Sequence, residues 1–309
     1  MSAARGRTTF DSLSRLAHRV ISRLIRTQVD ATTRRFEHEL LRALTNDGDG
    51  WLVISRHRHL SGSTAFECVT TDMGRIWMLR SDSVILPILR THGTWEPAEQ
   101  EFLRRRLAPG STVVNVGANV GYTALALSSI VGPSGQVVAL EPEPLNHRLL
   151  CVNTAGAHNI LPIHAAAGDL TGTIELHRSA TNTGDHRTAP HEDGIGGVTV
   201  PIVRLDDLCG DTRVDAIVAD TQGFDHRVIA GARAVITRCR PLLTVEFWPF
   251  GIRNVGDDPI AVIDAYRDLD YASIVKVPTG EDLTRCSSEE ILERSIAEFD
   301  HTTLALLPN

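Results

Sequence analysis

Three ionisable residues in the second half of the chain follow a pattern suited to proton transfer. Asp220 comes directly after the apolar run from Val214 to Ala219, and Glu246 lies near the end of the next such run, Pro241 to Phe247. His226 follows Asp220 by six residues, in the first turn of a helix predicted from His226 to Ile236. An unperturbed histidine pKa of about 6.5 suits a general base at neutral pH. We predict that these three side chains come from adjacent strand edges of one cleft.

Each of these residues also has a purely structural interpretation. Asp220 could cap the following helix, and His226 could be an ordinary surface residue of that helix. Glu246 could pair with an arginine such as Arg253. Carboxylates at Asp220 and Glu246, with a histidine nearby, could instead hold Mg²⁺, but no local metal-binding motif accompanies them.

A segment earlier in the chain predicts a ligand beside these groups. The sequence reads as a strand from Thr112 to Val116, a turn Gly117-Ala118-Asn119-Val120-Gly121, and a helix from Tyr122. Glycine lets backbone pass close to a ligand, because a Cβ atom there would collide with it. The helix N-terminus then offers free N–H groups that suit a carboxylate or a phosphate.

Glu141 specifies the kind of ligand further. It ends a second predicted strand, Gln136 to Leu140, roughly 20 residues after the glycine turn, where an acidic residue can accept hydrogen bonds from two ribose hydroxyls. We therefore expect an adenosine-containing cofactor. Gly117 and Gly121 are four residues apart, so the Gly-x-Gly-x-x-Gly fingerprint of dinucleotide sites is absent. This spacing favours S-adenosyl-L-methionine over NAD.

Three ordered motifs carry a resemblance to a known family. They span Asn115 to Thr123, Glu141 to Asn146, and Asp220 to Asp225. Together they resemble the FkbM-type family of S-adenosylmethionine-dependent methyltransferases, over roughly residues 75 to 280. The family usually has aspartate where this chain has Asn115, so an amide replaces an acidic contact near the methionine end of the cofactor.

The resemblance implies an O-methyltransferase that acts on a hydroxyl of a small molecule, such as a sugar or a polyketide-like compound. It also implies that the region of Asp169 lies beside the adenine. The expected cofactor-binding residues are Asn115, Gly117, Ala118, Asn119, Gly121, Thr123, Glu141, Pro142, Asn146, Asp169, Asp220 and Gln222. Two alternatives stay open, namely a nucleotide-cofactor oxidoreductase and a binding or scaffold protein with a vestigial cofactor pocket.

Alternating helical and extended patterns after residue 97 predict an α/β fold. The number of predicted strands matches a Rossmann-like, seven-stranded class I methyltransferase sheet, in which the last strand, here Thr302 to Leu307, inserts antiparallel. We expect this domain to cover residues 97–309. A small antiparallel β region over residues 51–96 and a basic amphipathic helical segment over residues 1–50 precede it.

The polar, glycine-rich stretch from Arg178 to Gly197 interrupts this alternation. A loop of about 20 residues inside a compact domain is usually functional or disordered. It reads either as a flexible lid over the acceptor site or as plain disorder. Asn182, Asp185, His186 and Arg187 are among its polar residues.

Charge and composition limit the partners. Residues 1–45 carry a net charge of +5, and the remainder carries −12, which argues against a nucleic-acid surface on the main domain. No apolar run approaches the length of a membrane-spanning helix, and we expect a cytoplasmic protein without stable membrane insertion. The N-terminal helix could cap the main domain, lie on a membrane, or form a homodimer contact.

Overall fold

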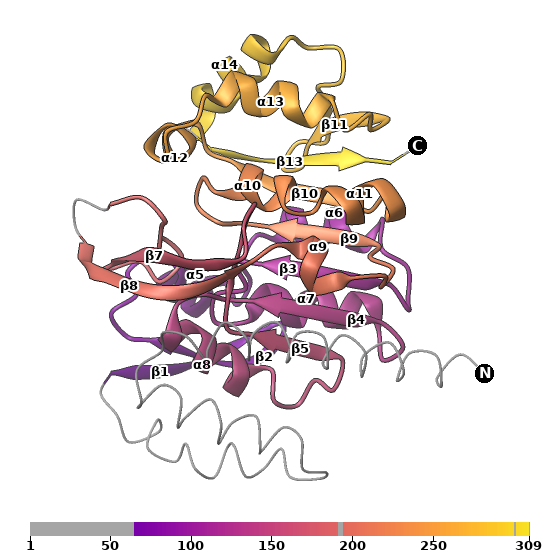
Figure 1. Cartoon of the computed structure of the whole chain (residues 1–309). Coiled ribbons are helices and arrows are strands. Elements are labelled where there is room, and N and C mark those ends of the chain that lie inside the picture. Colours follow the sequence, from indigo (N-terminus) through magenta and orange to yellow (C-terminus); the bar gives the residue numbers. More distant parts are fainter. Residues whose placement is uncertain (1–64, 191–193, 300, 309) are drawn as a thin grey trace.

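The computed structural model describes residues 65–190, 194–299 and 301–308. Its centre is a mixed sheet with the strand order β12-β11-β13-β10-β9-β3-β4-β5 (Figure 1). Strand β13 pairs antiparallel with both β10 and β11, whereas β10, β9, β3, β4 and β5 are parallel neighbours. The bounds are β3 Thr112–Val116, β4 Gln136–Leu140, β5 Ile160–Ile163, β9 Ala216–Ala219, β10 Leu242–Phe247, β11 Ser273–Lys276, β12 Glu281–Asp282 and β13 Thr302–Leu307.

The predicted class I sheet is confirmed, including the antiparallel insertion of the last strand. The two-residue strand β12 adds a short edge that the sequence did not indicate. The parallel strands are mostly apolar, as is typical of strands whose two faces are both covered. Val113 of β3 packs with one core cluster, and its neighbours Val114 and Val116 pack with the other.

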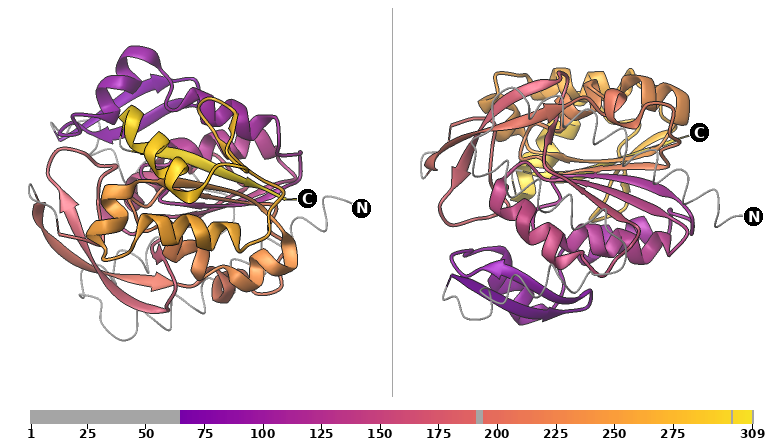
Figure 2. Two further views of the ribbon diagram at one scale, coloured as in Figure 1. Left: turned by 90° about the horizontal axis from the view of Figure 1, so that it is seen from above. Right: turned by 60° about the horizontal axis from the view of Figure 1, so that its bottom comes forward.

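Helices cover both faces of this sheet (Figure 2). One face carries α6 Pro97–Arg104, α7 Tyr122–Val131 and α8 Pro144–Asn153. The other face carries α9 Leu205–Cys209, α10 Asp225–Ala230, α11 Arg233–Cys239 and α13 Pro259–Arg267. Helices α12 Pro249–Asn254 and α14 Ser288–Phe299 contact α13 and each other.

The single helix expected from His226 to Ile236 is wrong, because the structure divides it into α10 and α11. The break falls at Gly231, which lies against the backbone of Gly168. A Cβ atom on Gly231 would lie 1.9 Å from the Gly168 carbonyl oxygen. Gly231 and Gly168 are far apart in sequence, so the local helical periodicity could not predict this contact or the break that accompanies it.

A hairpin that precedes the main sheet in the sequence packs beside the loop after β3, residues 117–121. Strands β1 Phe66–Thr71 and β2 Gly74–Leu79 pair antiparallel, as expected, and α5 Ile85–His92 follows. The Asn153 side chain bonds to both backbone groups of Trp77 and to the Val120 carbonyl, which fixes the hairpin to α8. The strand predicted at residues 51–55 and the N-terminal helical segment lie outside the described residues, and the predicted domain boundaries stay predictions.

A second, three-stranded sheet lies beyond the carboxyl ends of the parallel strands (Figure 1). It consists of β6 Ala166–Ala167, β7 Gly172–Ser179 and β8 Gly194–Val203. Both long strands extend into the stretch that we expected to be one loop, so the connecting segment begins at residue 180. Among the described residues, no helix is long and apolar enough to cross a membrane.

Candidate active site

A cavity of about 400 Å³ opens at the carboxyl ends of the parallel strands. This volume lies within the range of about 300–1,000 Å³ that is typical of small-molecule sites. Its walls come from the loops after β3, β4, β9 and β10, together with the segment that joins β7 to β8. Nine predicted site residues line it: Gly117, Ala118, Asn119, Thr123, Glu141, Pro142, Asp220, Gln222 and Glu246.

The two glycines of the loop after β3 are required by contacts within the protein. Gly117 has a φ of 81°, and a Cβ atom there would lie 1.8 Å from the Asp220 carbonyl oxygen. Gly121 has a φ of 99°, and a Cβ atom there would lie 2.8 Å from Leu150 Cδ1. Only Gly117 lines the cavity. Close approach to a ligand is therefore not the reason for Gly121, which lets α8 pack closely.

Glu141 is held at the cavity wall by two backbone groups. Its Oε2 accepts the N–H of Asn119 at 2.8 Å, and its Oε1 accepts the N–H of Glu143 at 2.8 Å. The side chain is only 4% exposed. Burial raises the pKa of Glu141 to about 8, and the two N–H groups partly oppose that rise. The carboxyl group is thus fixed where a ribose could meet it.

A buried amide oxygen atom at the cavity lacks a donor within the described part of the chain. The Oδ1 atom of Asn119, which lines the cavity, has no hydrogen-bond partner among the described residues. The Oδ1 atom of Asn115 also lacks a partner there, but Asn115 is 2% exposed, does not line the cavity, and donates through Nδ2 to the Val218 carbonyl at 3.5 Å. An unpartnered buried acceptor is costly, so Asn119 suits a ligand that carries N–H and O–H groups. The amino groups and ribose hydroxyls of S-adenosylmethionine meet that requirement.

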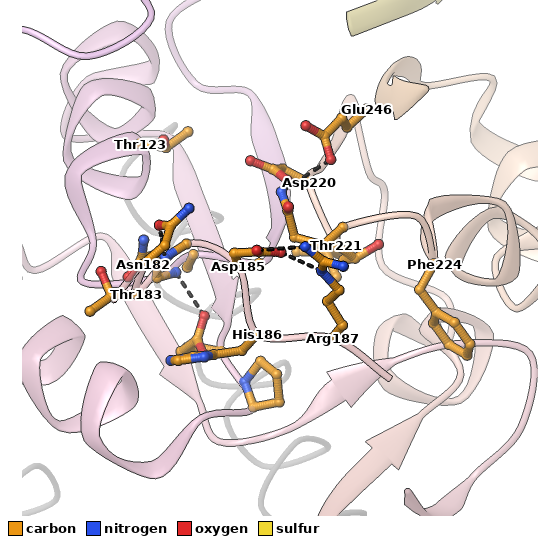
Figure 3. A pocket seen from close by; sticks show the side chains of 18 of the residues that line it. Thr123, Asn182, Thr183, Asp185, His186, Arg187, Asp220, Thr221, Phe224 and Glu246 are labelled. Carbon is orange, nitrogen blue, oxygen red and sulfur yellow. Dashed lines mark hydrogen bonds and ion pairs between the residues drawn. The ribbon is translucent and has the colours of Figure 1, made fainter. Parts of the chain in front are cut away.

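Asp220 and Glu246 form an acidic pair on one side of the cavity (Figure 3). The Gln222 side-chain Nε2 donates to Asp220 Oδ1 at 2.9 Å and to Glu246 Oε2 at 3.1 Å. Asp220 is open to the cavity, yet the surrounding protein still desolvates its carboxyl group and raises its pKa. Burial, and then the negative charge of Asp220, raises the pKa of Glu246 well above its ordinary value.

Two cavity residues near this pair gave no clear signal in the sequence. Glu96 lies just before α6 with a φ of 46°, and burial followed by the charges of Glu99 and Asp220 raises its pKa. His301 is the residue immediately before β13, and it also lines the cavity. A positive charge on its ring opposes the rise in the pKa of Asp220. Neither was among the predicted site residues, and the three-dimensional contacts place both at the cavity.

His226 does not join Asp220 and Glu246, so the predicted grouping of the three is wrong. Its Nε2 lies 2.7 Å from Asp257 Oδ2, within a separate surface hollow. Asp225, the preceding residue, faces the strand ends, where its Oδ1 accepts the Glu246 N–H at 3.1 Å. Because consecutive helical residues point about 100° apart, the His226 side chain is directed away from the cavity.

Three other expected cofactor residues lie outside the cavity wall. Asp169 Oδ2 accepts from Arg227 Nη1 at 2.8 Å, which draws it toward α10. Asn146 is 1% exposed and donates to the Thr183 carbonyl at 2.8 Å. Asn115 lies behind Val116, on the face of β3 that α6 and α7 cover. Their expected contacts with the cofactor stay predictions.

The segment between β7 and β8 forms another wall. Cavity-lining residues run continuously from Asn182 to Thr188. Arg187 forms a two-point ion pair with Asp185, at 2.5 and 2.6 Å (Figure 3). The Arg187 guanidinium lies 4.5 Å from the centre of the Trp248 ring. The segment therefore forms part of the cavity wall, and the predicted lid over the acceptor site stays a prediction. Within the described part of the chain, no group of three or more His, Cys, Asp or Glu side chains could hold a metal ion.

Comparisons with known proteins agree with the motifs. The family model for the Methyltransferase FkbM domain matches residues 115–272, about half of the chain. The 2-O-methyltransferase NoeI of Sinorhizobium fredii (strain NBRC 101917 / NGR234) is 25% identical over 155 residues, which cover 44% of this chain. The match spans 63% of NoeI, less than two thirds of its length.

The comparison with solved structures finds distant likenesses of low sequence identity. Methyltransferase FkbM from Methylobacillus flagellatus KT is 18% identical with a TM-score of 0.43, and the match covers 70% of this chain and 49% of that one. The fibrillarin of Aeropyrum pernix, solved with natively bound S-adenosyl-L-methionine, is 14% identical with a TM-score of 0.39, over 80% of this chain and 86% of that one. The family match, and not these likenesses, decides the assignment: the chain belongs to the FkbM family of methyltransferases, and its cofactor is S-adenosyl-L-methionine.

Proposed function

We propose that the protein is an O-methyltransferase that methylates a hydroxyl group of a small molecule, such as a sugar or a polyketide-like compound. The observation that carries this proposal is the acidic pair of Asp220 and Glu246, which Gln222 holds at the cavity. Two neighbouring carboxyl groups resist simultaneous ionisation, and burial together with the negative charge of Asp220 raises the pKa of Glu246. In this proposal Glu246 keeps its proton more readily than an ordinary glutamate, and the pair carries one negative charge.

S-adenosylmethionine supplies an electrophilic methyl group when it is bound. The protein must then align the acceptor and remove its hydroxyl proton. Alignment of two reactants can lower a barrier by about 7–11 kcal/mol, and a positioned base typically adds a factor of about 10²–10⁴. The ionised member of the Asp220 and Glu246 pair is the base in this proposal. The Gln222 amide keeps both carboxyl groups oriented toward the acceptor.

The cavity wall supports a neutral acceptor. Glu96, Asp220 and Glu246 line its acidic side, which disfavours phosphate or carboxylate groups there. Trp248 lines the cavity, and its ring centre lies 5.4 Å from that of Phe250, which is 48% exposed and lies outside the cavity lining. Aromatic rings of this kind can stack on the apolar face of a ring-shaped acceptor. The name of NoeI, a 2-O-methyltransferase, supports oxygen as the acceptor atom.

Methyl transfer from carbon-13-labelled S-adenosylmethionine tests the proposal. The protein is incubated with a panel of sugars and hydroxylated polyketides, and the products are examined by NMR for a labelled methoxy carbon. We expect a methoxy product whose rate of formation falls about 10²–10⁴-fold in Asp220→Asn and Glu246→Gln. Glu101→Gln, an exposed change on α6, is the control. A labelled N-methyl or C-methyl product, or full activity in both variants, contradicts the proposal.

A further inference from the structure

Asp82 joins two segments that are far apart in sequence. Its Oδ1 accepts the N–H groups of Val84, Ile85 and Leu86, at 3.0, 2.6 and 2.9 Å, at the start of α5. Its Oδ2 accepts the N–H of Thr183 at 2.9 Å and the Thr183 hydroxyl at 2.5 Å, across 101 residues. The Asp82 side chain is 3% exposed. One buried carboxylate therefore serves both a helix start and the segment after β7.

Further hydrogen bonds hold the same segment at the Thr181 and Thr183 carbonyl groups. The Thr181 carbonyl accepts the N–H of Ser83 at 2.7 Å and its hydroxyl at 2.9 Å. The Thr183 carbonyl accepts Asn146 Nδ2 at 2.8 Å, from the first turn of α8. The segment is thus held between the turn before α5 and the helix that follows Glu141.

This segment reaches the part of the cavity that contains Glu141. Asn182, Thr183 and Gly184 line the cavity together with Asn119 and Glu141. Figure 3 places Asn182 and Thr183 together, across the cavity from Glu246. A Cβ atom on Gly184 would lie 2.9 Å from Ile85 Cδ1 and 3.6 Å from Asn119 Nδ2. Residues 182–184 therefore fill the space between α5 and the loop after β3, residues 117–121.

Helix capping alone does not account for the second oxygen of Asp82. One side-chain oxygen is enough for an N-cap, and caps are usually exposed, whereas a buried carboxylate is costly unless both oxygens are bonded. We propose that Asp82 is a positioning residue for cofactor binding. Through Thr183 it holds residues 182–184 as a wall of the adenosine half of the site. This inference rests on the cofactor assignment and not on the choice of the base.

Two substitutions separate this role from capping. Asp82→Asn keeps one oxygen for the N–H groups of α5 but replaces the other with an amide that cannot accept from Thr183. Thr183→Val removes only the hydroxyl. Asp258→Asn is the matched control, because Asp258 caps α13 and accepts the Ile260 N–H at 3.1 Å, outside the cavity. The affinity for S-adenosylhomocysteine is measured by calorimetry, and amide hydrogen exchange is measured at residues 181–184.

We expect Asp82→Asn to raise the Kd of S-adenosylhomocysteine about 10-fold or more, since hydrogen bonds to charged groups contribute about 1.5–3 kcal/mol. Thr183→Val should raise this Kd by a smaller factor. The double variant with both substitutions should have a Kd no higher than that of Asp82→Asn alone. Exchange at residues 181–184 should accelerate in Asp82→Asn, and Asp258→Asn should match the wild type in both readouts.

A folded Asp82→Asn protein with the wild-type Kd overturns the proposal, and so does an equal loss of affinity in Asp258→Asn. If Asp82→Asn does not fold, Thr183→Val decides, because an unchanged Kd there contradicts the proposal. Failure of the wild-type protein to bind S-adenosylhomocysteine would instead contradict the cofactor assignment itself.

Discussion

Glu141 accepts the backbone N–H of Asn119 at 2.8 Å, so the acidic residue after β4 is bonded directly to the loop after β3. The two walls of the expected ribose site are thereby fixed relative to each other before any ligand binds. We predict that Glu141→Ala raises the Kd of S-adenosylhomocysteine about 10–100-fold, the effect of losing two hydrogen bonds to the ribose that contribute about 0.5–1.5 kcal/mol each. Calorimetric titration measures it, with Glu101→Ala as the control. An unchanged Kd would place the ribose elsewhere.

His226 lies outside the cavity, so its replacement tests whether it takes part in catalysis. We predict that His226→Gln changes kcat by less than about threefold, because the side chain contacts Asp257 and not the acidic pair. The loss of that contact should lower the free energy of unfolding by about 1 kcal/mol. Steady-state kinetics and urea unfolding measure the two effects. A loss of kcat by a factor of 100 would contradict the assignment of the base to Asp220 and Glu246.

Stability should fall as pH rises from about 6.5 to 8. Burial raises the pKa of Glu141 to about 8 and the pKa values of Glu99 and Asp225 to about 7. In this range the folded protein binds protons that the unfolded chain has released, so stability decreases as the pH increases. His147 and His226 have lowered pKa values and oppose this trend only below about 6.5, where the unfolded chain gains their protons.

Urea unfolding at pH 6.5, 7, 7.5 and 8 measures this dependence. The slope that Glu141 contributes cannot exceed about 1.4 kcal/mol per pH unit, and Glu141→Gln should flatten the curve. A free energy of unfolding that increases over this interval would contradict the raised pKa values.

Gly117 offers a test of the contact between the loop after β3 and Asp220. Gly117→Ala adds a Cβ atom 1.8 Å from the Asp220 carbonyl oxygen, at a φ of 81°. Gly93→Ala is the matched control, because Gly93 has a φ of 68° and a ψ of 4°, in the left-handed region, and no atom lies closer than 3.9 Å to the added Cβ. We expect the control to lose about 1 kcal/mol from backbone strain and Gly117→Ala to lose at least about 3 kcal/mol. Equal losses would mean that φ alone requires glycine at position 117.

The sheet was predictable because buried parallel strands are short apolar runs between turn residues. Strands β3 and β4 begin and end at the predicted residues. The ends of parallel strands meet at one edge, so Glu141, Asp220 and Glu246 could also be predicted to share a cavity. The prediction of His226 failed because it depends on the rotation of α10, which Asp225 fixes through its bonds to the strand ends.

The remaining walls could not be predicted, because long-range contacts build them. Asp82 and Thr183 are 101 residues apart, and neither belongs to a local motif. His301 reaches the cavity only because β13 inserts between β10 and β11. Asn182, Asp185 and Arg187 belong to a stretch that the sequence marks as polar, but the hydrogen bonds within it appear only in the folded chain.

A crystal structure of the complex with S-adenosylhomocysteine tests the central claim most directly, because that claim puts the cofactor and the base in one cavity. We predict ribose hydroxyls within hydrogen-bond distance of Glu141, and a sulfur atom that faces the open space beside Asp220 and Glu246. A ribose bound away from Glu141, or a sulfur atom separated from the acidic pair by protein, would contradict the account.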